Sequence, residues 1–354
     1  TAVVGLGMMG NSQIRNCLWK LPDFEITAIC DPFLPNLSAC EALFAEKSKP
    51  VACYRDHREM LKEADCDLVV VVSPDYTHEQ IACDCLNAGK HVRLEKPLAT
   101  TLRGCRNVRD AHAASGKILQ IGLELRYAAP TRKMREWLPR LGKVKMLTCN
   151  EFRPPFLPKR GAIDNWITQK RYSGGTLLEK NCHHFDLFNW FAASRPARVF
   201  ASGDNRVIYA DTDVLDNAFV TVEYENGMRA MLSLCLFAPK KAPGSTLNEL
   251  EFGMLGDCGR LEMRGDDVFV WDRADGAEER WHYARQNFEA HSDDILPSMV
   301  ELADCIRTGR EPVTGIREGI DSALVSFAAE RSAEEQRIVT IHELEEESGL
   351  RFLV

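Results

Sequence analysis

The chain has 354 residues, 45% of them hydrophobic and 27% charged, and its formal net charge is -8. Because a single hydrophobic core rarely extends beyond about 250–300 residues, this length predicts two domains. The acidic balance excludes the basic surface that nucleic-acid binding needs, and the longest aliphatic run, residues 68–72, is too short to cross a bilayer. We therefore expect neither nucleic acid nor a membrane as a partner.

The 13 cysteines are an odd number, scattered through both halves without a CxxC pair or the Cys/His spacing of a zinc site. We expect reduced, mostly buried cysteines, no bound metal and a cytoplasmic location. The chain begins at Thr1 inside a strand pattern, so we expect further residues upstream in the full protein. Whether those residues carry a targeting segment stays open.

The first stretch is a short apolar strand that runs into a GxGxxG pattern and then a helix over about residues 11–19. The pattern consists of Gly5, Gly7 and Gly10, with Met8 and Met9 between the last two glycines. The first glycine permits a tight turn, the second lets a phosphate approach the backbone, and the third allows close helix–strand packing. The helix N-terminus would then face a pyrophosphate.

A second strand, residues 25–30, ends in Asp31, about 20 residues after the glycines. An acidic residue at this distance typically accepts hydrogen bonds from the ribose hydroxyls of NAD. The residues that follow it, 32–34, contain no arginine that could receive the 2′-phosphate of NADP. The sequence therefore favours NAD over NADP.

Residues 67–72 form the continuous apolar run that is typical of a strand inside a parallel sheet. Ser73 and Pro74 follow it, then a helix over residues 78–88 and a further strand over residues 91–94. That strand ends in Glu95, Lys96 and a proline. Alternating strands and helices predict a doubly wound α/β fold, in which ligands bind at the carboxyl ends of the strands.

After residue 126 strands outnumber helices and follow one another directly, and the turn at residues 225–227 predicts a hairpin. We predict a Rossmann domain over residues 1–124 and an α+β domain with an open, mainly antiparallel sheet over residues 125–354. Helices would cover the inner face of that sheet. They are expected at residues 177–191, 293–308 and 316–332.

Three motifs resemble the Gfo/Idh/MocA family of oxidoreductases, which includes glucose-fructose oxidoreductase and inositol dehydrogenase. They read GLGMMG, SPDYTHEQIACDCLNAGKHVRLEKP and SGGTLLEKNCHHFDLF. The resemblance implies an NAD(P)-binding Rossmann domain, a catalytic role for Lys96, and an open sheet that often forms an oligomer interface. In the third motif Glu179 stands where the family usually has Asp, and His183 matches the family's His.

On one continuous helix, Glu179, His183 and Asp186 would share a face because their spacings are four and three. Gly174 and Gly175, just before it, would let a substrate or nicotinamide approach the backbone. The alternative is a buried, hydrogen-bonded helix start without a catalytic role.

We predict oxidation of a secondary alcohol on a sugar, inositol or related polyol, with hydride transfer to NAD and proton transfer to His183 or Lys96. Burial and a nearby nicotinamide cation would lower the pKa of Lys96. Glu179 and Asp186 would orient the hydroxyls.

Further residues are assigned to the site from their positions. Arg126, Trp166 and His184 are predicted to bind substrate, and His78 to support the cofactor edge together with Ser73, Pro74 and Glu95. The basic loop over residues 153–160, with Lys170 and Arg171, is a candidate lid that could meet a substrate carboxylate; solvated loop charges are the alternative.

Two other functions stay open: a glycoside-processing enzyme that oxidises its substrate transiently with bound NAD, and a non-catalytic NAD-binding regulator. Accumulation of free NADH would separate the first from a simple dehydrogenase. We expect a homodimer or homotetramer, because an open antiparallel sheet leaves an apolar face that needs cover.

Overall fold

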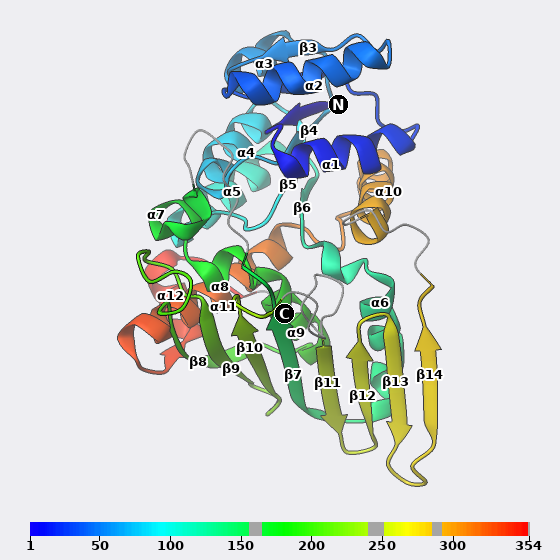
Figure 1. Ribbon diagram of the computed structural model, residues 1–354, viewed down its shortest axis with the longest axis vertical. Coiled ribbons are helices and arrows are strands. Elements are labelled where there is room, and N and C mark those ends of the chain that lie inside the picture. Colours follow the sequence, from blue (N-terminus) through cyan, green and yellow to red (C-terminus); the bar gives the residue numbers. More distant parts are fainter. Residues whose placement is uncertain (156–164, 240–250, 285–291, 353–354) are drawn as a thin grey trace.

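The computed structural model describes residues 1–155, 165–239, 251–284 and 292–352, and they form two sheets with associated helices (Figure 1). The first sheet is parallel throughout and has the order β3-β2-β1-β4-β5-β6. Its strands are β1 (Ala2–Val4), β2 (Ala28–Cys30), β3 (Ala52–Tyr54), β4 (Leu68–Val71), β5 (His91–Leu94) and β6 (Leu119–Ile121). The order reverses between β1 and β4, so this is the Rossmann topology that was predicted.

Both faces of this sheet are covered, which explains why its strands read as continuous apolar runs. Val3 and Val70 point into one core and Val4 and Val71 into the other. The first core is covered by α1 (Met8–Asn16), α2 (Leu34–Glu46) and α10 (Ser292–Thr308), and the second by α3 (His57–Glu63), α4 (His78–Asn87) and α5 (Leu102–Ser115).

The second sheet has nine strands in the order β14-β13-β12-β11-β7-β10-β9-β8-β15. Only the β7/β10 pair is parallel, so the predicted mainly antiparallel sheet is confirmed. The strands are β7 (Val144–Phe152), β8 (Pro196–Asp204), β9 (Asn217–Tyr224), β10 (Arg229–Cys235), β11 (Glu251–Gly256), β12 (Gly259–Arg264), β13 (Asp267–Asp272), β14 (Glu278–His282) and β15 (Val339–Thr340). The predicted hairpin joins β9 to β10, with Gly227 at a φ of 81°.

The inner face of the second sheet is covered by α9 (Cys182–Ala192) and α11 (Ile316–Glu335), while α6 (Ala129–Trp137) packs on β12 and β13 and α12 (Ile341–Ser348) on β8. The expectation that α10 would also cover this face is wrong. Its residues Ile295 and Met299 share a core with Val3, and the helix lies beside α1 in Figure 1. The remaining short helices are η1 (Leu18–Lys20), η2 (Asp75–Thr77), η3 (Glu124–Arg126), η4 (Leu138–Leu141), η5 (Trp166–Thr168), α7 (Lys170–Ser173) and α8 (Thr176–Glu179).

The single helix predicted over residues 177–191 is interrupted. It consists of α8 and α9, separated by Lys180 and Asn181. Asn181 is the N-cap residue of α9, and its carbonyl accepts hydrogen bonds from the amides of His184 (2.9 Å) and Phe185 (3.0 Å). The Asn181 side chain makes no capping hydrogen bond and donates instead to Glu151 at 2.6 Å. Because the helix is interrupted here, the predicted common face of Glu179, His183 and Asp186 is lost.

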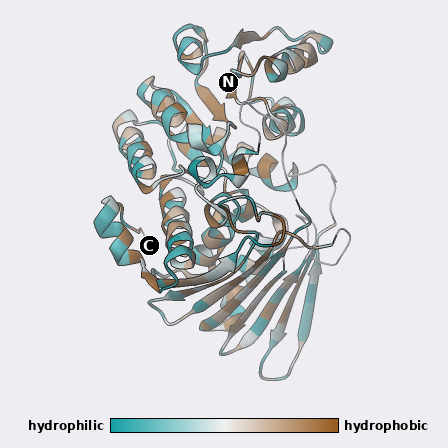
Figure 2. Ribbon diagram, turned by 60° about the vertical axis from the view of Figure 1, so that its left-hand side comes forward, coloured by the Kyte–Doolittle hydropathy of each residue, from teal (hydrophilic) through white to brown (hydrophobic). Residues whose placement is uncertain are grey.

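The strands of the second sheet carry both hydrophobic and hydrophilic colours in Figure 2, as expected for a sheet with one covered face. None of the helices within the described ranges is long and apolar enough to pass through a bilayer. The part of the candidate lid at residues 156–160 lies outside the described residues. So do residues 247–250, the first four of a strand that the sequence predicts over residues 247–255.

Candidate active site

The carboxyl edge of the parallel sheet faces the inner helices of the second sheet, and β5 delivers Glu95 and Lys96 to this boundary (Figure 1). Glu95 is buried and accepts a 2.6 Å hydrogen bond at Oε1 from the side chain of Gln13 on α1. This contact ties the end of β5 to the helix that follows the glycine-rich loop. Lys96 is therefore held next to the predicted cofactor site.

Lys96 reaches across to the second domain. Its Nζ donates to the carbonyl oxygen of Glu179 at 2.7 Å and to Oε1 of the same residue at 2.8 Å. Burial alone would lower the pKa of Lys96, but the Glu179 carboxylate outweighs it and the net pKa is raised. The pKa of Lys96 is therefore not lowered as expected. The prediction failed because the sequence did not reveal that Glu179 contacts Lys96.

Glu179 is the acidic centre of the site. Burial opposes its ionisation, yet Lys180 and Lys96 lower its pKa to about 2. Its second oxygen, Oε2, lies 3.8 Å from Nζ of Lys180. Burial raises the pKa of the neighbouring Asp75, at the start of η2, because its charged form would lose solvation. The carboxylate that carries the negative charge here is thus Glu179.

His183 lies in the first turn of α9 and points toward the turn that follows β6. Its Nε2 lies 3.5 Å from Oε1 of Glu124, on the turn after β6. Its side chain is partly exposed, whereas Glu124 is buried. An imidazole next to a buried carboxylate is oriented for proton transfer, which is the arrangement that a general base requires.

Asp186 and Arg126 contact each other and do not line the pocket that opens beside the Lys96–Glu179 pair. Arg126 donates through Nε at 2.8 Å and Nη2 at 2.7 Å to the two oxygens of Asp186. The same guanidinium lies over the ring of Trp190, 5.5 Å from its centroid. This bidentate, buried pair joins η3 to α9, so the geometry gives no support to a direct substrate contact by either residue.

His184 does not line the pocket either. It is buried, stacks on Phe252 and lies 3.5 Å from Glu151 through Nε2, and burial lowers its pKa. Trp166 makes an edge contact with the ring of Tyr76, with 6.3 Å between centroids, and its neighbour Ile167 lines the pocket instead. Neither predicted substrate residue is among those that line it.

The space expected beside Gly174 and Gly175 is already filled. A Cβ on Gly175 would lie 2.3 Å from Cδ of Glu330, and a Glu330 oxygen accepts a 2.7 Å hydrogen bond from the amide of Leu177. The glycines therefore admit side chains of the protein itself, including Leu178 beside Gly174. The expectation that they leave room for substrate is wrong.

The glycine-rich loop has the geometry of a dinucleotide cradle. A Cβ on Gly5 would lie 2.5 Å from the carbonyl oxygen of Val72, and one on Gly10 would lie 2.0 Å from that of Gly5. At Gly7 a Cβ would meet nothing within 4 Å, so the loop backbone is open there. Met8, the first residue of α1, is 67% exposed at this opening, and Met9 packs against the core below.

Asp31 lies at the end of β2, beside this loop. Its carboxylate accepts hydrogen bonds from the amides of Leu6 and Phe33, both at 2.8 Å, and from the side chain of Asn36 at 3.2 Å. A carboxylate offers about four acceptor positions, so about one remains for a ribose hydroxyl. The structure also brings Arg55, from the segment after β3, to 3.5 Å from the carbonyl of Pro32.

The segment after β4 forms the other side of the switch point. Ser73 accepts a 2.6 Å hydrogen bond from the hydroxyl of Thr77, and the carbonyl of Pro74 accepts one from the amide of the same residue. His78 is buried, with its ring nitrogens 2.7 Å from the carbonyl of Pro97 and 2.9 Å from that of Ser73. His78 thus connects the segment after β4 with the segment after β5, which is the local support that was predicted for it.

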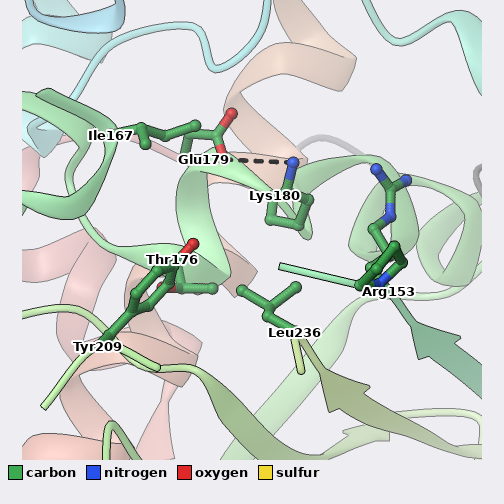
Figure 3. Close-up of a pocket in the computed structure, with 8 residues that line it drawn as sticks. Arg153, Ile167, Thr176, Glu179, Lys180, Tyr209 and Leu236 are labelled. Atoms are coloured by element: carbon green, nitrogen blue, oxygen red, sulfur yellow. Dashed lines mark ion pairs between the residues drawn. The ribbon is translucent and has the colours of Figure 1, made fainter. Parts of the chain in front are cut away.

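A pocket opens next to the Lys96–Glu179 pair, and Figure 3 shows its lining residues. They are Arg153, Pro154, Ile167, Thr176, Glu179, Lys180, Tyr209 and Leu236. The sequence did not mark Tyr209, nor Glu124 and Asp75 nearby. Lys180 gave a signal, since it is a charged residue in a motif whose apolar residues predict an enclosed helix.

Two family models match the chain. The NAD-binding Rossmann domain of the Gfo/Idh/MocA oxidoreductases matches residues 1–123, and the C-terminal alpha/beta domain of the same family matches residues 139–341. A myo-inositol 2-dehydrogenase of Thermotoga maritima is 26% identical over 351 residues, which is 97% of this chain and 98% of that protein.

Solved structures share the fold. One is an oxidoreductase of Agrobacterium radiobacter in complex with NAD+, L-tartaric acid and magnesium, with a TM-score of 0.81, 17% identity, and 97% of this chain and 98% of that chain covered. Another, from Desulfitobacterium hafniense, has a description that names NADPH dependence; its TM-score is 0.81 at 19% identity, covering 97% of each chain. The two domain matches together show that the chain belongs to the Gfo/Idh/MocA family of NAD-binding oxidoreductases.

Proposed function

We propose that the protein is a dehydrogenase that transfers a hydride from a secondary alcohol of a sugar, inositol or related polyol to NAD. The observation that carries this proposal is the Lys96–Glu179 pair, which lies at the carboxyl edge of the parallel sheet, beside a glycine cradle that is open at Gly7. The similarity to a myo-inositol 2-dehydrogenase over almost the full length supports the substrate class.

The cofactor is proposed to be held by the cradle and by Asp31. NAD+, when bound, supplies the acceptor for the hydride that leaves the carbinol carbon. Gly7 would admit its pyrophosphate to the N-terminus of α1, while Gly5 and Gly10 let the loop pack closely on itself and on Val72. Asp31 would accept a hydrogen bond from the ribose. The carboxylate would repel a 2′-phosphate, so NAD is preferred over NADP although Arg55 lies close by.

Because of Glu179, the two candidate bases, Lys96 and His183, would have different roles. Glu179 keeps Lys96 protonated, and an ammonium group has no lone pair with which to take a proton. Lys96 can instead donate a hydrogen bond to the alkoxide that develops as hydride leaves. We therefore assign the proton to His183, which Glu124 orients, so that a ketone, a reduced cofactor and a protonated imidazole result.

The test is NAD+ reduction measured against a panel of sugars, inositols and uronic acids. With a substrate from that panel, Lys96→Met and His183→Asn should each lower kcat/KM by about 10²- to 10⁴-fold, the usual range for loss of an acid–base group. Lys133→Met, which removes a lysine paired with Glu136 outside the site, should have no effect.

The proposal is wrong if both variants fold and keep turnover close to that of the wild type. NADH should accumulate in step with ketone. Conversion of substrate without NADH would instead support an internal redox cycle with bound NAD.

A further inference from the structure

Two cationic side chains line the pocket beside the Lys96–Glu179 pair, and a neutral polyol has no charge to pair with them. Arg153, just after β7, and Lys180, between α8 and α9, both line it. In Figure 3 both side chains lie on one side of the pocket, with Tyr209 and Thr176 across from them and Leu236 between. These cations come from two different elements, so their convergence is a property of the fold.

Arg153 uses only part of its guanidinium for internal contacts. Its Nε lies 2.5 Å from Oε1 of Glu151, which is buried and also accepts a 2.6 Å hydrogen bond from the side chain of Asn181. Within the described residues, Glu151 is the one ionic partner that the structure gives Arg153. The two terminal nitrogens of the guanidinium remain for a bidentate contact, the geometry that suits a carboxylate.

Lys180 is packed in among charges of both signs. Its Nζ lies 3.8 Å from Glu179, whose other oxygen is engaged by Lys96. Burial lowers the pKa of Lys180, the Glu179 carboxylate raises it, and the positive charges of Arg153 and Lys96 lower it, so that the net pKa is lowered. An anion between Lys180 and Arg153 would relieve this repulsion and stabilise both cations.

Among the described residues, three cationic side chains, Lys96, Lys180 and Arg153, come together beside the carboxylates of Glu179 and Glu151, while burial favours the neutral form of Asp75. We propose that the pocket formed by Arg153 and Lys180 binds a carboxylate of the substrate, so that the preferred substrates are sugar or polyol acids. This proposal rests on the proposed dehydrogenase function and narrows its substrate class.

The two terminal nitrogens of the Arg153 guanidinium match the two oxygens of one planar carboxylate. The apolar side chains of Ile167 and Leu236 exclude water from the walls, which strengthens a charge-assisted hydrogen bond. Lys170 and Arg171 do not take this role. Lys170 pairs with Glu330 and Glu334, and the exposed Arg171 stacks on Tyr172.

The experiment compares matched pairs of compounds with the full-length enzyme and saturating NAD+: glucuronic acid against glucose, and a hexose phosphate as a third arm. The acid should have the highest kcat/KM, by about 10-fold or more over glucose. Arg153→Gln and Lys180→Met should each raise KM for the acid about 10- to 100-fold with little change in kcat, and leave KM for glucose within about twofold.

Arg171→Gln is the matched control and should behave as the wild type with all three compounds. The second variant, Lys180→Met, is needed because Arg153→Gln removes the arginine that pairs with the buried Glu151 and could alter folding. In Lys180→Met, Glu179 keeps its ion pair with Lys96. As a readout independent of turnover, glucuronic acid should raise the Tm of the NADH complex of the wild type and not of either variant.

The outcomes separate the two proposals. Stabilisation by the acid without NAD+ reduction would support this subsite and overturn the dehydrogenase function. Turnover of neutral polyols without preference for the acid, or a preference for the phosphate, would overturn the subsite and leave the function standing. No stabilisation by the acid and no turnover would overturn both.

Discussion

Glu179 decides the protonation of the site, because it contacts both lysines. It accepts a hydrogen bond from Lys96 and lies within ion-pair distance of Lys180, and its buried carboxylate is held ionised with a pKa of about 2. An aspartate, the usual residue in the family, would be shorter by one methylene. The longer side chain lets the carboxylate serve two cations at once, one from each side of the domain boundary.

Replacing Glu179 by Gln should therefore change how stability depends on pH. A carboxylate with a folded pKa of about 2 and an ordinary value of 4.5 contributes stability above pH 4.5, and loses it as the pH falls toward 2. Glu179→Gln should lower the free energy of unfolding at neutral pH by about 3–5 kcal/mol, since Lys96 stays buried without its partner. Over the acid range its stability should fall less steeply than that of the wild type.

Urea unfolding at a series of pH values measures both effects. Glu334→Gln is the control, because Glu334 is an exposed partner of Lys170 and such pairs contribute about 0–1 kcal/mol. Parallel pH profiles for wild type and Glu179→Gln would contradict the assignment of the low pKa to Glu179.

At the scale of elements, the glycine-rich loop gives a matched pair of substitutions. A methyl group at Gly10 would collide with the Gly5 carbonyl at 2.0 Å, whereas Gly7 has an ordinary φ of -69° and open space around it. Gly10→Ala should destabilise the fold by about 1–3 kcal/mol, the usual cost of overpacking. Gly7→Ala should keep its stability within about 0.5 kcal/mol of the wild type.

Gly7→Ala, which should hardly change stability, should nevertheless weaken cofactor binding. Its methyl would occupy the space through which a pyrophosphate approaches, so the Kd for NADH should rise about 10-fold, or about 1.4 kcal/mol. Thermal unfolding without cofactor and fluorescence titration with NADH give the two numbers. Unchanged NADH affinity in Gly7→Ala would show that the cradle is not the cofactor site.

The elements that were predicted correctly are those whose sequence signals are local. The glycine-rich turn, the apolar strand that became β4 and the hairpin at Gly227 each depend on neighbouring residues, and each is found. α10 was predicted as a helix but assigned to the wrong core. Amphipathic periodicity shows that a helix has a buried face, and it does not show which sheet that face meets.

The site was predicted in part, for the same reason. Lys96 and Glu179 were both marked by their motifs, but their contact spans 83 positions and could not be read from spacing. The break at Asn181 was missed because the apolar residues on either side keep a helical pattern. Arg153 belongs to the basic loop that the sequence marked as a candidate to meet a substrate carboxylate, but its position beside Lys180 depends on the packing of β7 against α9 and had no local signal.

At the scale of the whole molecule, none of the described helices covers the outer face of the large sheet. Phe200 on β8, Phe219 on β9 and Met231 on β10 are exposed on it, and they share a face because Phe200 and Met231 are both in register with Thr221, two residues from Phe219. Met146 and Leu255, on β7 and β11, extend the apolar surface. Patches of this kind mark protein interfaces, and a self-complementary one closes a symmetric dimer.

We propose that a second copy of the chain covers this face, as predicted for a homodimer or homotetramer. Phe219 is 64% exposed, so replacing it by Asp should leave the protomer folded while placing a charge in the interface. Burying an unpaired carboxylate costs several kcal/mol, which corresponds to a rise in the dimer Kd of about 100-fold or more. Sedimentation at micromolar concentration should show a dimer or larger assembly for the wild type and a shift to monomer for Phe219→Asp. Val300→Asp, which charges an exposed valine on α10, should leave the assembly intact, and a monomeric wild type would rule the interface out.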